Sequence, residues 1–191
     1  WTPVGGADLA GYRNRYALYR GDPALQDAHA ACPWVVTWDD HEVDNDYADA
    51  IAEDDAAEFE ARRAAAYQVW YEHMPVRGYA GIGRNHFNMH RRIVLGDLAQ
   101  ISLLDGRQFR DDREICDNND YPDYGFGNYR ERCARVFDES RTLLGDEQER
   151  WLAKNLANCT STWNVMASPG PFLPFRYAHD GKDLRYIGAW D

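Results

Sequence analysis

The sequence of 191 residues predicts a layered α/β domain with a mixed sheet. Segments with apolar residues three or four positions apart, typical of helices, alternate with short apolar runs of strand length. One pair of runs has a hairpin pattern, which gives antiparallel pairing, and other runs are joined through a helix, which allows parallel pairing. Hydrophobic residues make up 45% of the chain and aromatic residues 14%, enough to build a sizeable core.

The N-terminal part of the chain predicts three helices and one strand. Aromatic and apolar residues recur three and four positions apart from Leu9 to Tyr19, which is the spacing of one helix face. Asp22-Pro23 has the pattern of a helix N-cap followed by proline in the first turn. The third helix begins with acidic residues, whose negative charges interact favourably with the positive end of the helix dipole. The helices are expected within residues 1–20, from Pro23 to about Ala31 and from about Glu53 to His73, with a strand from Trp34 to Trp38.

A β-hairpin is expected over residues 86–104. Apolar residues at alternating positions predict two strands, and Gly96-Asp97 provides the turn between them. The chain is then irregular from Asp111 to Asn128, which is long for a loop and is typical of a binding element or a lid.

The C-terminal part predicts one helix and one strand. Residues 146–149 resemble a capping box that opens a helix through Leu156, with Leu152 and Leu156 facing inward. A buried strand is expected over residues 163–167.

The most informative segment is the acidic run after the first strand. Five of the eight residues from Asp39 to Asp46 are acidic. Carboxylates that converge with a histidine at a strand end are typical of sites for hard di- or trivalent metal ions. The alternative is a solvated acidic loop. Trp34 and Trp38, which flank the strand, favour the metal site, because a merely solvated loop has no need to begin at an apolar strand.

The overall composition argues against several classes of protein. The net charge of −11 makes a nucleic-acid surface improbable, because such surfaces depend on clustered Lys and Arg. Bound metals would still allow an acidic protein to handle phosphate esters. No apolar run has the length needed to cross a bilayer. Neither end has the composition of a signal peptide or a tail, so we expect an internal piece of a longer protein.

The four cysteines form no Cys-x-x-Cys pair, which argues against a zinc ribbon or a thioredoxin-like site. Cys116 and Cys133 bracket a loop rich in Gly, Asn, Asp and Tyr. A disulfide that closes this loop in an oxidising compartment and two reduced thiols are both consistent with the sequence.

From Trp38 to Glu42 the chain resembles the PhoD-like alkaline phosphatases, a branch of the calcineurin-like metallophosphoesterases. Gly106 stands where the family has threonine in a Leu-Asp-Thr-Arg-Gln-Tyr-Arg run. The ordered matches extend across nearly the whole chain, which makes chance agreement very improbable. The other similar segments are residues 12–19, 66–75, 104–110 and 144–152.

The resemblance implies a layered β-sandwich flanked by helices, with a metal centre at the strand ends. Residues 1–191 would form the central part of one metallophosphatase domain, incomplete in this chain and without a second domain. Members are typically exported phosphatases or phosphodiesterases, and iron with calcium is the metal set associated with them. The family's other metal ligands come from motifs before and after these residues. Export and the identity of the metals rest on the resemblance alone.

The resemblance also assigns roles to the Asp-Asp-His-Glu run. Asp40 matches a metal ligand, and an aspartate is a hard anionic donor; the alternative is an exposed loop carboxylate. His41 matches the histidine beside the leaving group, where an imidazole can supply a proton. The alternative for His41 is a structural histidine bonded to Asp39 or Glu42. We expect Asp39 and Glu42 to orient His41 rather than to bind metal.

Arg107 follows a second strand end. Its guanidinium has the geometry to fork onto a phosphate, and a buried ion pair with Asp105 is the equal alternative. The leading hypothesis is metal-dependent hydrolysis of small-molecule phosphate esters, as an alkaline phosphatase or phosphodiesterase, with this piece inactive alone. The alternative is a non-catalytic calcium-binding or degenerate domain on the same scaffold.

Overall fold

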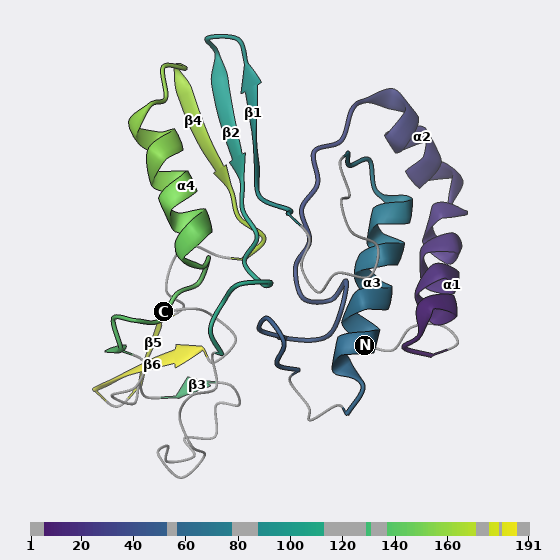
Figure 1. Cartoon of the computed structure of the whole chain (residues 1–191), viewed down its shortest axis with the longest axis horizontal. Helices are drawn as coiled ribbons and strands as arrows, with labels where there is room; N and C mark the ends of the chain where they lie inside the picture. Colours follow the sequence, from purple (N-terminus) through teal and green to yellow (C-terminus); the bar gives the residue numbers. More distant parts are fainter. Residues whose placement is uncertain are drawn as a thin grey trace. The chain divides into compact units, whose positions relative to one another are not determined.

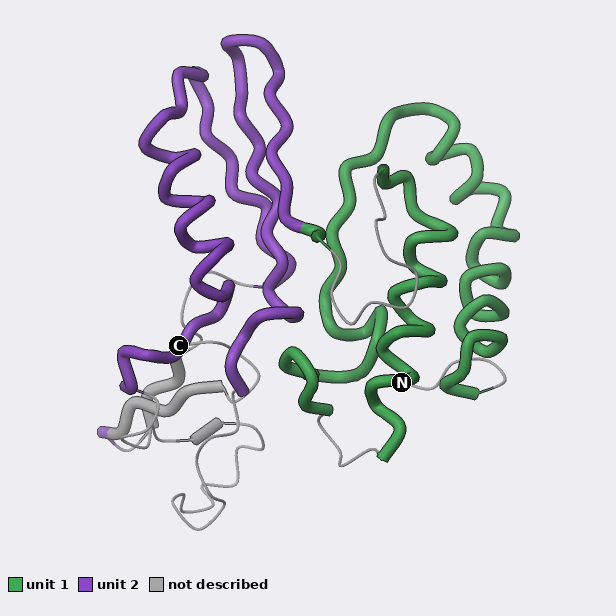
Figure 2. The backbone as a smooth tube through the Cα atoms, viewed as in Figure 1, with its two compact units in different colours: residues 1–89 green, residues 90–191 purple. Residues whose placement is uncertain are grey.

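The structure is a computed structural model (Figure 1) that describes residues 6–52, 57–77, 88–112, 129–130, 137–170, 176–179 and 181–186. The chain divides into two compact units, residues 1–89 and 90–191 (Figure 2), and each is considered by itself. Cys116, Cys133 and most of the irregular segment over 111–128 lie outside the described residues. The expectations for the disulfide and the lid therefore remain predictions.

The first unit contains three helices: α1 (Leu9–Arg20), α2 (Pro23–Ala31) and α3 (Phe59–His73). The α2 helix begins where the sequence predicts, and α1 lies within the residues 1–20 in which a helix is expected. Asp22 caps α2 by accepting a hydrogen bond from the backbone N–H of Leu25 (2.9 Å), and Asp8 caps α1 in the same way. An ion pair between Arg13 and Glu72 (2.6 Å) joins α1 to α3 and lowers the pKa of Glu72 to about 2.

The predicted strand over residues 34–38 is wrong. This segment is extended but belongs to neither sheet of the described residues. The side chain of Trp34 stacks on His29, with ring centroids 4.0 Å apart, and its Nε1 donates to the carbonyl of Ala28 (3.2 Å). A β-prone run forms a strand only when a neighbouring strand satisfies its backbone.

The predicted start of α3 is also wrong. The helix begins at Phe59, and Ala57 and Glu58 form a turn, while residues 53–56 lie outside the described part. The buried face of α3 holds the core of this unit. Trp38 stacks on Tyr67 at 4.4 Å between centroids and meets the edge of Trp70 at 5.1 Å. Trp38 is 1% exposed, so the residue before the acidic run is anchored in the core.

The second unit contains the mixed sheet that the sequence predicts. Strands β1 (Arg91–Leu95) and β2 (Ala99–Leu103) form the antiparallel hairpin, and β2 pairs in parallel with β4 (Trp163–Ala167). Gly96 occupies the turn with a φ of +57°, a left-handed conformation that favours glycine. The α4 helix (Asp146–Ala157) contacts the sheet, where Gln100 donates to the carbonyl of Asn155 (3.2 Å).

A second small sheet was not predicted from the sequence. It consists of three antiparallel strands in the order β3-β6-β5. Only the backbone of these strands is described. Their bounds are Tyr129–Arg130 for β3, Arg176–His179 for β5 and Lys182–Tyr186 for β6.

Two predictions about side chains in the second unit are wrong. Trp163 and Val165 of β4 are 66% and 43% exposed, and β4 is the last strand in the β1-β2-β4 order of the described residues. On α4, Leu152 is buried as expected, but Leu156 is 40% exposed.

The capping box at the start of α4 is wrong as well. The N-cap is Gly145, with a φ of +75° and no capping side chain. The hydroxyl of Thr142 accepts a hydrogen bond from the Gly145 N–H (2.8 Å) and donates one to the Glu149 carboxylate. The N–H of the N-cap residue is therefore bonded by a residue that lies before the helix, instead of by a side chain in the first turn. No helix in the described part of the chain is long and apolar enough to span a membrane.

Candidate metal centre

The acidic run folds into a turn that is organised around Asp40. The Asp40 carboxylate accepts hydrogen bonds from the backbone N–H groups of His41 (2.9 Å) and Asp46 (2.8 Å). Its carbonyl accepts from the N–H groups of Val43 and Asp44, both at 2.8 Å. Asp40 is only 9% exposed, so the alternative of an exposed loop carboxylate does not describe it. These bonds fix the position of the carboxylate within the turn.

His41 lies beside this buried carboxylate but points outward. Its side chain is 61% exposed, and its Nε2 lies 4.0 Å from an Asp40 oxygen. The same Nε2 is 2.8 Å from the Oδ1 of Asn45. Because Asn45 donates from Nδ2 to the Asp46 carboxylate (3.3 Å), its Oδ1 faces His41 as an acceptor. Nε2 of His41 is then the donor, which leaves Nδ1 as the ring nitrogen for another partner.

The contact of Asn45 with His41 is a feature of the site that the sequence reasoning missed. The four-residue spacing from His41 to Asn45 was the available signal, since such spacing brings side chains together within one turn. The expected orienting role of Asp39 and Glu42 stays a prediction. In the structure, the Glu42 carboxylate accepts a hydrogen bond from the backbone N–H of Asp39 (2.8 Å).

Burial raises the pKa of Glu42 above its ordinary value. The hydrogen bonds from the N–H groups of Asp39 and of Glu42 itself oppose this shift, while the negative charges of Asp39 and Asp40 add to it. The ionised form of Glu42 is thus disfavoured beside two other acids. A nearby cation would relieve that repulsion.

The arrangement of donors fits part of a metal site. A carboxylate accepts at about four positions, so the two backbone bonds to Asp40 are compatible with a metal contact. A buried anionic oxygen suits hard cations such as calcium and iron. However, no three His, Cys, Asp or Glu side chains converge as a metal-binding group in the stretches that the structure describes. Asp44 instead forms an ion pair with Arg62. A complete site therefore needs further ligands.

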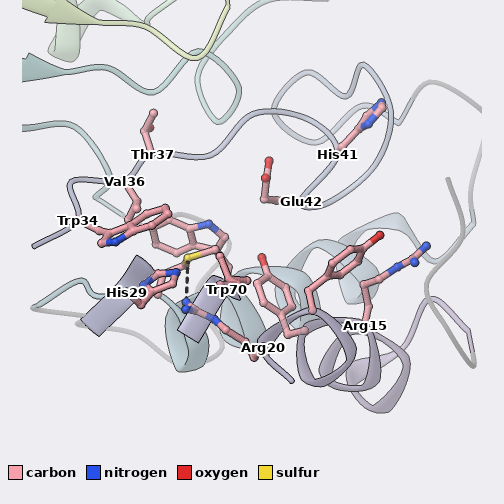
Figure 3. A pocket seen from close by; sticks show the side chains of 13 residues that line it. Arg15, Arg20, His29, Trp34, Val36, Thr37, His41, Glu42 and Trp70 are labelled. Atoms are coloured by element: carbon pink, nitrogen blue, oxygen red, sulfur yellow. Dashed lines mark hydrogen bonds between the residues drawn. The ribbon is translucent and has the colours of Figure 1, made fainter. Parts of the chain in front are cut away.

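A pocket of about 380 Å³ opens next to the turn, and His41 and Glu42 line one part of it (Figure 3). Trp34 lies toward the opposite end. Arg15 and Arg20 approach from α1, and Arg20 donates to the Met74 sulfur (3.5 Å). The pocket thus combines aromatic walls with guanidinium groups, a combination that suits an organic anion.

Arg107 belongs to the second unit and is 7% exposed. It follows β2 in a turn that Asp105 holds: the Asp105 carboxylate accepts from the backbone N–H of Arg107 (3.0 Å). The contact that the structure shows between these residues is therefore through the backbone of Arg107. The structure brings Asp39, Asp40, His41 and Glu42 together in the first unit, and Arg107 belongs to the second.

The described residues define an α/β protein with a buried aspartate and an exposed histidine on one turn. The family model for PhoD-like phosphatases matches residues 5–191. The chain belongs to this family, as the resemblance at Trp38–Glu42 implied.

Two individual proteins are similar to the chain over nearly all of its length. It is 43% identical to alkaline phosphatase D of Bacillus subtilis (strain 168) over 185 residues, which covers 96% of the chain and 30% of that protein. A solved structure described as "Structure of PhoD" matches with a TM-score of 0.84 and 38% identity, over 99% of this chain and 37% of the other. The chain thus spans about a third of the length of these relatives.

Proposed function

We propose that the complete protein hydrolyses small-molecule phosphate esters with metal ions bound at Asp40. Family membership supports hydrolysis of phosphate esters. The observation that carries the residue assignment is the turn in which Asp40 is buried and fixed while His41 projects outward. Within the layered β-sandwich that we propose for the complete domain, motifs before and after these residues supply the remaining ligands.

We assign iron and calcium to this site because of the resemblance and because a carboxylate oxygen suits both ions. Bound metal ions supply positive charge for the phosphoryl oxygens and lower the pKa of water. The residues of this chain supply the rest. Asp40 offers a pre-positioned anionic oxygen, and its backbone bonds limit the rearrangement that binding requires.

His41 carries the proton that the departing alcohol needs. Its Nε2–H is held by Asn45, so we assign the transfer to Nδ1 of the doubly protonated imidazolium, which becomes a neutral imidazole with its hydrogen on Nε2 when the proton leaves. The leaving group enters the pocket lined by His41 and Glu42, where aromatic side chains form part of the wall. We assign Arg107 to the phosphate in the complete protein, where its guanidinium can fork onto two phosphate oxygens and offset their negative charge.

Removal of metal from the complete protein is expected to abolish turnover of an aryl phosphate, and addition of iron and calcium is expected to restore it. The reason is that Asp40 and His41 alone cannot neutralise the phosphoryl charge. The measurement is steady-state hydrolysis before and after treatment with a chelator, with a chelator already saturated with iron as the control.

Hydrolysis that survives removal of all metal would contradict metal dependence. A protein that gains thermal stability from metal while hydrolysing nothing would instead support the alternative, a non-catalytic calcium-binding or degenerate domain.

A further inference from the structure

We propose that Gln148 is a positioning residue for Arg107 and acts through Asp105. This inference rests on the role proposed for Arg107. Gln148 lies in the first turn of α4 and is 1% exposed, while Asp105 follows β2 and is 0% exposed. The side-chain amide of Gln148 therefore meets the backbone of a buried turn from a different element of the same unit.

The amide of Gln148 engages both backbone groups of Asp105. Its Oε1 accepts from the Asp105 N–H (2.8 Å), and its Nε2 donates to the Asp105 carbonyl (2.8 Å). Nε2 also donates to the carbonyl of Leu144 (2.8 Å), which fixes the direction of the amide. The Gln148 side chain thus bonds to both the N–H and the carbonyl of Asp105, as the backbone of a neighbouring strand would.

This contact begins where the sheet ends. The N–H of Leu104 donates to the Ala167 carbonyl (2.9 Å), next to the last pair in the β2–β4 register. At Asp105 the chain leaves β4 and Gln148 replaces the strand as its partner. Without Gln148, the N–H and the carbonyl of Asp105 would stay buried without these hydrogen bonds. Buried polar groups without partners lower the stability of the folded protein.

Asp105, which Gln148 holds in place, in turn fixes the backbone of Arg107 through hydrogen bonds. The Asp105 carboxylate accepts from the backbone N–H groups of Arg107 (3.0 Å) and Gln108 (3.1 Å), and Gln108 adds a bond from its side chain. The backbone of Arg107 is therefore fixed relative to α4. A guanidinium that binds phosphate in a forked geometry depends on such placement, because functional groups must be held to within about 0.5 Å.

Packing alone does not explain a glutamine at this position. The neighbouring core contains Leu104, Leu144 and Leu152, and an apolar side chain would fill similar space among them. Only an amide offers an acceptor and a donor in the geometry that Asp105 uses. The polar group thus selects one conformation of the Asp105–Arg107 turn.

The test replaces Gln148 with leucine in the complete protein and measures binding of inorganic phosphate by calorimetry, together with kcat and KM for an aryl phosphate. We expect phosphate affinity to fall about ten- to a hundredfold, the range for a lost charge-assisted hydrogen bond. In the Arg107→Ala background, Gln148→Leu should have no further effect, because its influence passes through Arg107.

Gln100→Leu is the matched control. Gln100 is also a buried glutamine that links β2 to α4, but its bond goes to Asn155. Gln148→Met is the second variant: it keeps the length of the side chain and removes both hydrogen bonds to Asp105, so the same loss of phosphate affinity as in Gln148→Leu is expected.

The proposal is overturned if Gln148→Leu binds phosphate within about threefold of the parent, well below the range expected for such a bond. It is also overturned if Gln100→Leu lowers phosphate affinity equally, or if Gln148→Leu still lowers it in the Arg107→Ala background. If neither Gln148 variant folds, the role of Gln148 is structural and the proposal is overturned as well. Turnover by the parent reports separately on the proposed function, because phosphate binding is measured without hydrolysis.

Discussion

Replacement of His41 with alanine in the complete protein is expected to lower turnover of a phosphate ester with a poor leaving group by about 10²–10⁴, the usual contribution of general acid catalysis. The imidazole is exposed and held through Nε2, so Nδ1 can face the departing oxygen. An aryl phosphate should lose less, because its leaving group needs little help from a proton. The measurement is kcat for both esters.

His73→Ala provides the control for loss of a histidine from the same unit. His73 stacks on Tyr16 and its Nδ1 bonds to the Val69 carbonyl, so it serves the packing of α1 against α3. Rates within about threefold of the parent for both esters in His41→Ala would exclude a leaving-group role, given the size expected of acid catalysis.

Replacement of Asp40 with alanine is expected to remove both bound metal and turnover. Loss of a partner that merely orients a metal ligand costs about 10–100-fold in affinity, so loss of the ligand itself should cost at least as much. The variant should also be less stable, because the part-buried N–H groups of His41 and Asp46 lose their acceptor, at about 1 kcal/mol for each bond. Metal content by elemental analysis and kcat test the prediction.

Two further variants separate the metal role of Asp40 from its structural role. Asp40→Asn keeps one neutral oxygen and the shape of the side chain, so it should retain more metal than Asp40→Ala. Asp22→Ala removes the N-cap of α2 and should cost about 0.5–2 kcal/mol of stability without loss of metal. Full metal content and turnover in Asp40→Ala would contradict the assignment.

The features that the sequence predicted well depend on local interactions. The start of α2 follows from Asp22 and Pro23, which lie within one turn of each other. The hairpin follows from alternating apolar residues around a glycine that adopts a positive φ. Each requires contacts between residues close in the chain.

The features that were missed depend on distant partners. Residues 34–38 have β propensity, but a strand also needs a neighbouring strand to pair with. None of the described residues forms such a strand beside this segment. The small β3-β6-β5 sheet joins segments far apart in the sequence. The start of α4 depends on Thr142, which lies before the helix and was outside the expected capping pattern.

The candidate site shows the same division. The resemblance identified the Asp-Asp-His-Glu run, and the structure shows that its members lie on one turn. The way Asp40 holds that turn depends on the N–H of Asp46, a residue in a left-handed conformation (φ +51°) that sequence patterning did not predict. The bond from His41 to Asn45 also depends on this fold of the loop.

Contact between Asp40 and a metal ion is best tested by anomalous diffraction from crystals of the complete, metal-loaded protein. We expect an anomalous peak about 2.0–2.6 Å from an Asp40 oxygen, the distance range of carboxylate ligands to such ions. A well-ordered Asp40 that bonds only to the backbone of its own turn, with every ion located elsewhere, would contradict the account.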